Sequence, residues 1–224
     1  MNDIKQFEQY TDHDIISRVL SGELALYEII IRRYNSYLFR IGRTYNFSHA
    51  DTEDLMQETY LSAYTGLNKF ENRSSFKTWL VKIMLNHCYH KKHKFSFQKE
   101  IMTENLEQET AIPMFANNND TDKTIVNKEL GRVLENALQK IPEDYRIVFS
   151  LRELNGMNIS ETSEALNISE SNVKVRLNRA KNMLRSEIEK LYSPADIFEF
   201  NLIYCDKIVE NVMKTIFLIK GSSQ

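Results

Sequence analysis

Between residues 158 and 185 the chain reads NISETSEALNISESNVKVRLNRAKNMLR. The pattern predicts a short helix, a turn at residues 166–169 and a longer helix. In the longer helix, apolar residues recur at positions 173, 177, 180 and 184, so they form one stripe that must pack inward. The stretch therefore predicts a helix-turn-helix in the last third of the chain.

The neighbouring side of the longer helix is polar and basic. Its members are Lys174, Asn178, Lys181 and Arg185, extended by Ser171 and Val175 and flanked by Arg176 and Arg179. Lys and Asn side chains can read base edges in the major groove, while Arg side chains and a helix N-terminus hold phosphates. The alternative is an ordinary solvated helix. The capped short helix and the turn before it favour a helix that reads duplex DNA.

Composition favours an all-helical chain. Six Gly and three Pro in 224 residues, about a third of average usage, leave few residues for tight turns. Cys88 and Cys205 form no CxxC pair, so a disulfide framework is excluded and a reducing compartment is expected. No apolar leader follows Met1, and no uncharged apolar run approaches the ~20 residues of a membrane span. We expect a soluble, cytoplasmic protein.

The predicted fold class is all-α, with two small helical domains joined by a flexible acidic and polar linker. The predicted boundaries are 1–95 for the first domain, 96–124 for the linker, 125–192 for the second domain and 193–224 for an extension with one amphipathic helix. In the first domain, helices are expected at 12–20 and 23–43, from 49 onward, and from 75 or 76 to about 92. Ser160 and Ser169 are predicted N-caps in the second domain.

Charge divides the first domain into an acidic and a basic part. Residues 48–58 hold four acids and no base, and one side of the helix there carries Asp54, Gln57, Glu58 and Leu61. An exposed leucine among carboxylates suits a docked protein partner, although periodicity alone is equally compatible with a plain solvated face. Residues 73–99 hold seven Lys or Arg and no acid. Cations beside aromatic residues are typical of a surface that binds single-stranded nucleic acid, with the cations on the phosphates and the aromatic rings on the unstacked bases. An exposed Phe70 would stack on a base there, whereas Trp79 is expected in the core.

Other classes of protein fit less well. The chain lacks nucleotide-binding glycine motifs, HExxH and a Gly-flanked serine, so we expect no enzyme and no cofactor. His87, His90 and His93 recur every three residues, but this period drifts around a helix and the neighbouring lysines repel a cation, so we expect no metal. A stand-alone helix-turn-helix regulator that binds duplex DNA without polymerase is the main alternative.

Three strings carry a resemblance to a known family. They are DTEDLMQET at 51–59, SFKTWL at 75–80 and ISESNVKVRL at 168–177. Their residues, order and separation resemble those of extracytoplasmic-function (ECF) sigma factors, the promoter-specificity subunits of bacterial RNA polymerase. The resemblance covers about residues 11–191. It implies that the first domain is region 2, that the second is region 4, and that the chain binds core RNA polymerase and directs promoter-specific initiation.

The resemblance also implies residue roles. The acidic helix would bind the clamp helices of the largest polymerase subunit through Asp54, Gln57, Glu58 and Leu61. Recognition and melting of the minus-10 element, with capture of a flipped non-template base, would involve Phe70, Asn72, Arg73, Ser74, Ser75, Lys77, Asn86, His90 and Lys91. The minus-35 duplex would be read by Ser171, Asn172, Lys174, Val175, Asn178, Arg179 and Lys181. Val175 is apolar at a position where a polar side chain would be expected to face the bases, so it would either touch a thymine methyl or read no base.

The extension beyond residue 193 is open to two interpretations. Ile208, Val212 and Ile216, with Val209, form one apolar stripe. One interpretation is an extra helix that packs on region 4 with Cys205 as a small core residue; the other is a docking site for an anti-sigma factor. Some ECF sigma factors carry a similar ending, usually with Arg where this chain has Tyr204. An anti-sigma factor is thus left open as a further partner.

Overall fold

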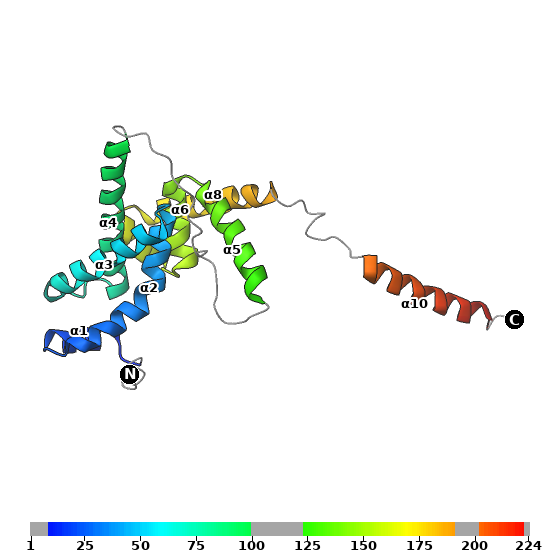
Figure 1. Ribbon diagram of the computed structural model, residues 1–224, viewed down its shortest axis with the longest axis horizontal. Helices are drawn as coiled ribbons and strands as arrows, with labels where there is room; N and C mark the ends of the chain where they lie inside the picture. The colour runs from blue at the N-terminus through cyan, green and yellow to red at the C-terminus, as the bar shows by residue number, and fades with distance from the viewer. Residues whose placement is uncertain (1–8, 100–122, 191–201, 222–224) are drawn as a thin grey trace. The chain divides into compact units, whose positions relative to one another are not determined.

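The computed structural model describes residues 9–99, 123–190 and 202–221 (Figure 1). These residues are helical or lie in short connections, and no strand occurs among them. The predicted all-α class is therefore confirmed. The described residues up to Arg185 form one compact unit, and Ser186 onward forms a second.

The first helices follow from their caps. Helix α1 (Asp12–Leu20) begins after Thr11, whose side chain forms a capping box with Asp14, and it ends at Ser21. A 3₁₀ turn, η2 (Leu24–Leu26), precedes helix α2 (Tyr27–Thr44). The predicted helix at 23–43 was therefore wrong at its start, because the chain first winds through η2.

Helices α3 and α4 complete the first half of the unit. Helix α3 (His49–Gly66) is capped by the Ser48 hydroxyl and continues into a 3₁₀ turn, η3 (Leu67–Lys69). Helix α4 (Phe76–Lys99) runs past the predicted end near residue 92. The linker predicted from residue 96 thus overlaps the end of α4, and residues 100–122 of that linker lie outside the described part of the chain.

The second half begins with two α-helices followed by a π-helical segment. Helix α5 spans Lys123–Gln139 and helix α6 spans Glu143–Phe149, after Pro142. The chain then widens into a π-helical segment, η4 (Ser150–Leu154), in which the Asn155 N–H donates to the Ser150 carbonyl at 2.9 Å. Such widened turns are rare and occur mostly at sites with a special role.

The predicted helix-turn-helix follows this segment and is confirmed. Its helices are α7 (Ile159–Leu166) and α8 (Glu170–Glu189). Asn158, which forms a capping box with Glu161, caps α7, so the prediction that Ser160 does so was wrong. The Ser169 hydroxyl accepts the Asn172 N–H at 3.2 Å, as an N-cap should.

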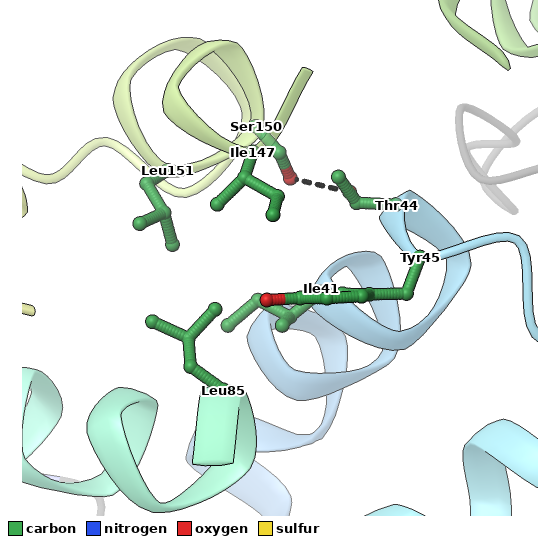
Figure 2. Close-up of a pocket in the computed structure, with 7 residues that line it drawn as sticks. All are labelled: Ile41, Thr44, Tyr45, Leu85, Ile147, Ser150 and Leu151. Atoms are coloured by element: carbon green, nitrogen blue, oxygen red, sulfur yellow. Dashed lines mark hydrogen bonds between the residues drawn. The ribbon is translucent and has the colours of Figure 1, made fainter. Parts of the chain in front are cut away.

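Both halves contribute to one hydrophobic core. Leu38, Leu80 and Met84 of the first half belong to the same buried cluster as Ile147, Leu151 and Met157 of the second. Figure 2 shows part of this contact, where α2, α4 and the α6–η4 segment meet. A smaller cluster around Leu138 and Ile141 supports the helix-turn-helix from behind, through partly buried side chains such as Met183 and Leu184.

The second unit contains helix α10 (Leu202–Gly221), which lies in the extension at 193–224 where one helix was predicted. Ile208, Val209, Val212 and Ile216 of this helix are exposed. No helix in the described part of the chain is both long enough and apolar enough to cross a membrane.

Candidate nucleic-acid interface

Helix α8 presents the polar face that its sequence predicts. Val173 and Ala180 are buried, whereas Lys174, Val175 and Asn178 are exposed on the other side. The turn that sets this orientation depends on Asn167, whose φ of 52° and ψ of 44° are left-handed. Asparagine tolerates this conformation better than most residues. The result is a helix with a packed back and an accessible reading face.

Three cations on α8 contact residues of the same half. The Arg179 guanidinium donates to the Tyr145 hydroxyl at 3.2 Å. Arg176 pairs with Asp144 at 3.2 Å, and Lys181 pairs with Glu153 at 2.9 Å. These pairs are largely exposed, so each contributes little to stability and can exchange for a phosphate. The predicted members Ser171 and Lys181 are also exposed, and Asn172 is half-buried at the first turn.

Helix α3 exposes a mixed acidic and apolar face. Asp54, Gln57 and Glu58 are exposed, and Leu61 is 67% exposed in the same row. The opposite side is buried through Leu55, Thr59 and Ala63. A leucine this open among polar neighbours is a ready contact for an apolar side chain of a partner. The geometry brings together the four residues predicted to bind polymerase, and their role stays a prediction.

The loop between η3 and α4 differs from its expected arrangement. Phe70 is half-buried rather than exposed, with its ring centroid 5.4 Å from that of Phe76 and 5.1 Å from that of Trp79. The aromatic cluster withdraws Phe70 from solvent because burying the ring against two others is favourable. Trp79 packs against the core, as predicted. Asn72 holds the turn at φ 55°.

The other residues predicted to bind the minus-10 element lie on this loop and along α4. Arg73 pairs with Glu71 at 2.6 Å, and the Ser75 hydroxyl accepts the Thr78 N–H at 3.1 Å at the start of α4. Ser74 is half-buried, and Asn86 and His90 are exposed. The predicted residues are thus spread from the loop along α4.

Two lysines in this set are already engaged. The Lys77 ammonium donates to the Asn155 carbonyl at 2.6 Å and lies 4.7 Å from the Tyr37 ring centroid. Burial lowers the pKa of Lys77. Lys91 pairs with Asp51 at 2.7 Å. Burial acts to raise the pKa of the Asp51 carboxyl, but hydrogen bonds from Lys91 and Ser48 outweigh it and lower that pKa.

The histidines of α4 do not converge. His87 Nε2 lies 3.1 Å from the Ser62 hydroxyl and His87 Nδ1 lies 3.6 Å from a Glu58 oxygen, while His93 packs on the Tyr89 ring. Across the described residues, no three His, Cys, Asp or Glu side chains gather in a group that could hold a metal ion.

Sequence reasoning missed the contacts that join the two halves of the compact unit. Lys82 pairs with Glu164 at 2.7 Å, and Lys92 pairs with Glu143. Arg43 pairs with Glu135 at 2.8 Å in a buried position. Charge periodicity indicates which side of a helix is polar, and it carries no signal for a partner 51 to 92 positions away.

A short capped helix, a turn and a longer helix with an exposed polar face are the arrangement found in helix-turn-helix DNA-binding proteins. Comparison with known families narrows this class. The family "Sigma-70 region 2" matches residues 30–94, and "Sigma-70, region 4" matches residues 131–184. The two matches together span more than half of the chain.

Curated relatives agree with the family matches. The chain is 26% identical over 190 residues to the ECF RNA polymerase sigma-E factor of Haemophilus influenzae, covering 82% of this chain and 98% of the relative. It is equally similar to the sigma-E factor of Escherichia coli K12, of which it covers 97%. The chain belongs to the sigma-70 family as an ECF-type RNA polymerase sigma factor.

Solved structures share the fold. CnrH in complex with the cytosolic domain of CnrY aligns with a TM-score of 0.59 at 21% identity, over 80% of this chain and 97% of that one. The sigma factor RpoE of Bartonella quintana, in complex with the anti-sigma factor NepR, aligns with a TM-score of 0.55 at 20% identity, over 71% and 96%.

Proposed function

We propose that this sigma factor divides promoter recognition between its two halves. The duplex minus-35 element lies along α8, where Lys174 and Asn178 face base edges and Arg179 faces a phosphate. The observation that carries this assignment is the exposed polar face of α8 above a buried Val173 and Ala180. A helix of this kind fits the width of the major groove.

The minus-10 element belongs to the other half. The loop at 70–75 and the basic side of α4 supply cations and amides for a separated strand. Phe70 then serves this surface by shaping the loop with Phe76 and Trp79 rather than by stacking on a base in the form described here. Asn86 and His90 are exposed beyond the loop and are available to bases.

The acidic face of α3 is the proposed contact with core RNA polymerase. It combines the carboxylates of Asp54 and Glu58 with the exposed side chain of Leu61. Charged groups around an apolar contact steer the encounter and fix its register. Holding both DNA-reading halves on one polymerase raises their effective concentration at the promoter.

The division into a region 2 domain, a linker and a region 4 domain is part of the same proposal, with the linker predicted at 96–124 shortened at both ends by α4, which runs to Lys99, and α5, which begins at Lys123. The family matches at 30–94 and 131–184 support it. The chain is proposed to carry no catalytic step of its own and to work in the cytoplasm, beside polymerase and DNA. An anti-sigma partner is part of the proposal as well, and it is supported by the RpoE structure of Bartonella quintana, in which the sigma factor is in complex with the anti-sigma factor NepR.

The test is run-off transcription with core RNA polymerase of the source bacterium on DNA upstream of this protein's own gene. We expect initiation that depends on the protein and is lost in the variant D54A/Q57A. The variant E53A is the matched control, because Glu53 is exposed on the same helix and pairs with His49. Tight duplex binding with neither initiation nor co-elution with core enzyme would instead favour a stand-alone regulator.

A further inference from the structure

One side of α4 carries an exposed tyrosine inside the basic block at 73–99. Tyr89 is 56% exposed. Phe76 is buried and Trp79 is half-buried, so Tyr89 is the one exposed Phe, Tyr or Trp among the side chains that the structure describes between residues 73 and 94. A single exposed ring is ordinary on a protein surface. The meaning of this one therefore depends on the groups around it.

The neighbours of Tyr89 on the surface of α4 are polar. Asn86 is exposed one turn before it, His90 beside it and His93 one turn after it. At 3.6 residues per turn, these four side chains leave the helix within about 100° of one another. Cys88 is buried on the opposite side. The solvent-facing side of α4 at this point thus combines one tyrosine ring with several hydrogen-bonding groups.

The Tyr89 ring is held by the histidines next to it. Its centroid lies 4.1 Å from the centroid of His93, with 56° between the ring planes, and 5.9 Å from the centroid of His90. Contacts between aromatic rings are favourable and restrict the side chains that make them. A ring that is already restricted loses less conformational entropy when a ligand binds to it. Tyr89 is therefore oriented before any ligand arrives.

The surroundings of Tyr89 match the chemistry of a surface that binds a single strand. The basic block holds seven Lys or Arg and no acid, and Lys94 is exposed beyond His93. Proteins that bind single-stranded nucleic acid combine such cations with rings on which bases stack. Phe70 does not offer a free ring, because it packs against Phe76 and Trp79. An exposed ring for a base is instead available at Tyr89.

We propose that Tyr89, held by His93, is a base-stacking site for the separated DNA strand, and that it extends the minus-10 surface past Asn86 and His90. Stacking tolerates every base, because every base has a π-face. Tyr89 therefore adds affinity for single-stranded DNA without selecting a sequence. The inference rests on the proposed function, since it takes α4 as the surface that meets the melted strand.

The test measures the binding of two fluorescein-labelled 20-nucleotide strands to the full chain, without polymerase, by fluorescence anisotropy. One strand is oligothymidylate, and the other has the same phosphates with an abasic sugar at every position. We expect Y89A to bind oligothymidylate about tenfold more weakly than wild type and to bind the abasic strand within about twofold of wild type. Y89F keeps the ring, so it should match wild type on both strands.

Two further variants separate stacking from charge and from general surface effects. K94Q removes a cation and keeps the ring, so it should weaken binding to both strands by the same factor. Y10A removes a tyrosine that is 38% exposed outside the basic block, so it should bind both strands as wild type does. Y89A should keep the urea midpoint of wild type, because the Tyr89 side chain is exposed.

Three results would overturn the proposal. They are equal binding of oligothymidylate by Y89A and Y89F, an equal loss by Y89A on the two strands, and a wild-type chain that binds oligothymidylate no more tightly than the abasic strand. The strand assay is independent of polymerase. If Y89A loses affinity for oligothymidylate alone but wild type supports no initiation in the run-off assay, the proposed function fails and the stacking site stands. If wild type initiates but Y89A equals Y89F on both strands, the stacking site fails and the proposed function stands.

Discussion

Arg43 and Glu135 lie 92 positions apart in the chain, yet Arg43 Nη2 and Glu135 Oε1 are 2.8 Å apart and both residues are buried. Removing one partner of a buried ion pair costs about 3–5 kcal/mol, because the other charge stays buried without compensation. We expect E135A to lower the free energy of unfolding by that amount in urea titrations. The exposed E153A, which loses a surface pair with Lys181, should change it by less than about 1 kcal/mol.

Replacing both partners provides the control for this prediction. The double variant R43M/E135M keeps the volume and removes both charges, so it should recover most of the stability lost in E135A. A loss in E135A below about 1 kcal/mol would show that the pair is solvated in solution and that the halves are apart.

Gly42 allows α2 to approach α3 closely. A Cβ at position 42 would stand 2.5 Å from Thr52 Cγ2 and 2.9 Å from its Oγ1. We expect G42A to destabilise the fold by about 1–3 kcal/mol through overpacking, despite the gain of about 1 kcal/mol in helix propensity. Thermal unfolding of G42A, T52A and G42A/T52A should show that the double variant loses less stability than the two single losses combined.

Gly66 is the matched control for this crowding. A Cβ there would meet Trp79 at 3.5 Å, which is ordinary contact. G66A should therefore fold with nearly wild-type stability. Additive losses in the G42A and T52A cycle would mean that α2 and α3 are farther apart than described.

Asn167 sets the turn of the helix-turn-helix through a left-handed backbone. Asn167 is exposed, so its substitution changes backbone strain rather than core packing. We expect N167V to cost about 1–2 kcal/mol, because a β-branched residue is strained in this region. N167G should match wild type, since glycine adopts a positive φ freely. Equal urea midpoints for N167V and N167G would contradict the assigned turn.

Cys88 gives the fold a dependence on alkaline pH. Burial raises the pKa of its thiol, and the Glu143 carboxylate adds to the effect. The unfolded thiol ionises near pH 8.5, whereas the folded thiol stays protonated well above that value. Stability is therefore complete below about pH 8.5 and falls as pH rises, by up to about 1.4 kcal/mol per pH unit.

Urea titrations at pH 7.5, 8.5 and 9.5 measure this dependence. The background C205S leaves Cys88 as the one thiol of the sequence. The variant C88A/C205S should be less stable at pH 7.5 because of its cavity, and it should lose less stability as pH rises. Equal slopes in the two proteins would contradict a protonated, buried thiol.

Patterns within one helix were enough to predict most of the fold. The stripe at Val173 and Ala180 and the cap at Ser169 define α8 because both depend on neighbours within two turns. The start of α2 and the end of α4 were misplaced because helix ends respond weakly to local pattern. Phe70 was expected in solvent because its packing depends on Phe76 and Trp79, whose positions are set by the tertiary fold.

The sequence was also enough to predict which helix faces carry the candidate surfaces. It was not enough to predict which residues of the second half contact those faces. Lys82 and Lys92 stand out in the sequence as cations of a basic block. Nothing near them in the chain indicates that Glu164 and Glu143 engage them. Similarly, the π-helical segment from Ser150 to Leu154 contains ordinary helix-forming residues, and its widened turn accompanies the contact with Arg40.

The core shared by the two halves has a consequence for how such chains can be recombined. A chimaera that joins this chain's first half to the promoter-reading half of a relative inherits Arg43, Thr44 and Ile41 without the surfaces that cover them here. Unless the incoming half supplies residues that pair with Arg43 and pack on Ile41, the chimaera exposes to solvent an arginine and an apolar surface that are buried in this chain. Exchange of promoter specificity between relatives is therefore constrained at positions that never touch a promoter.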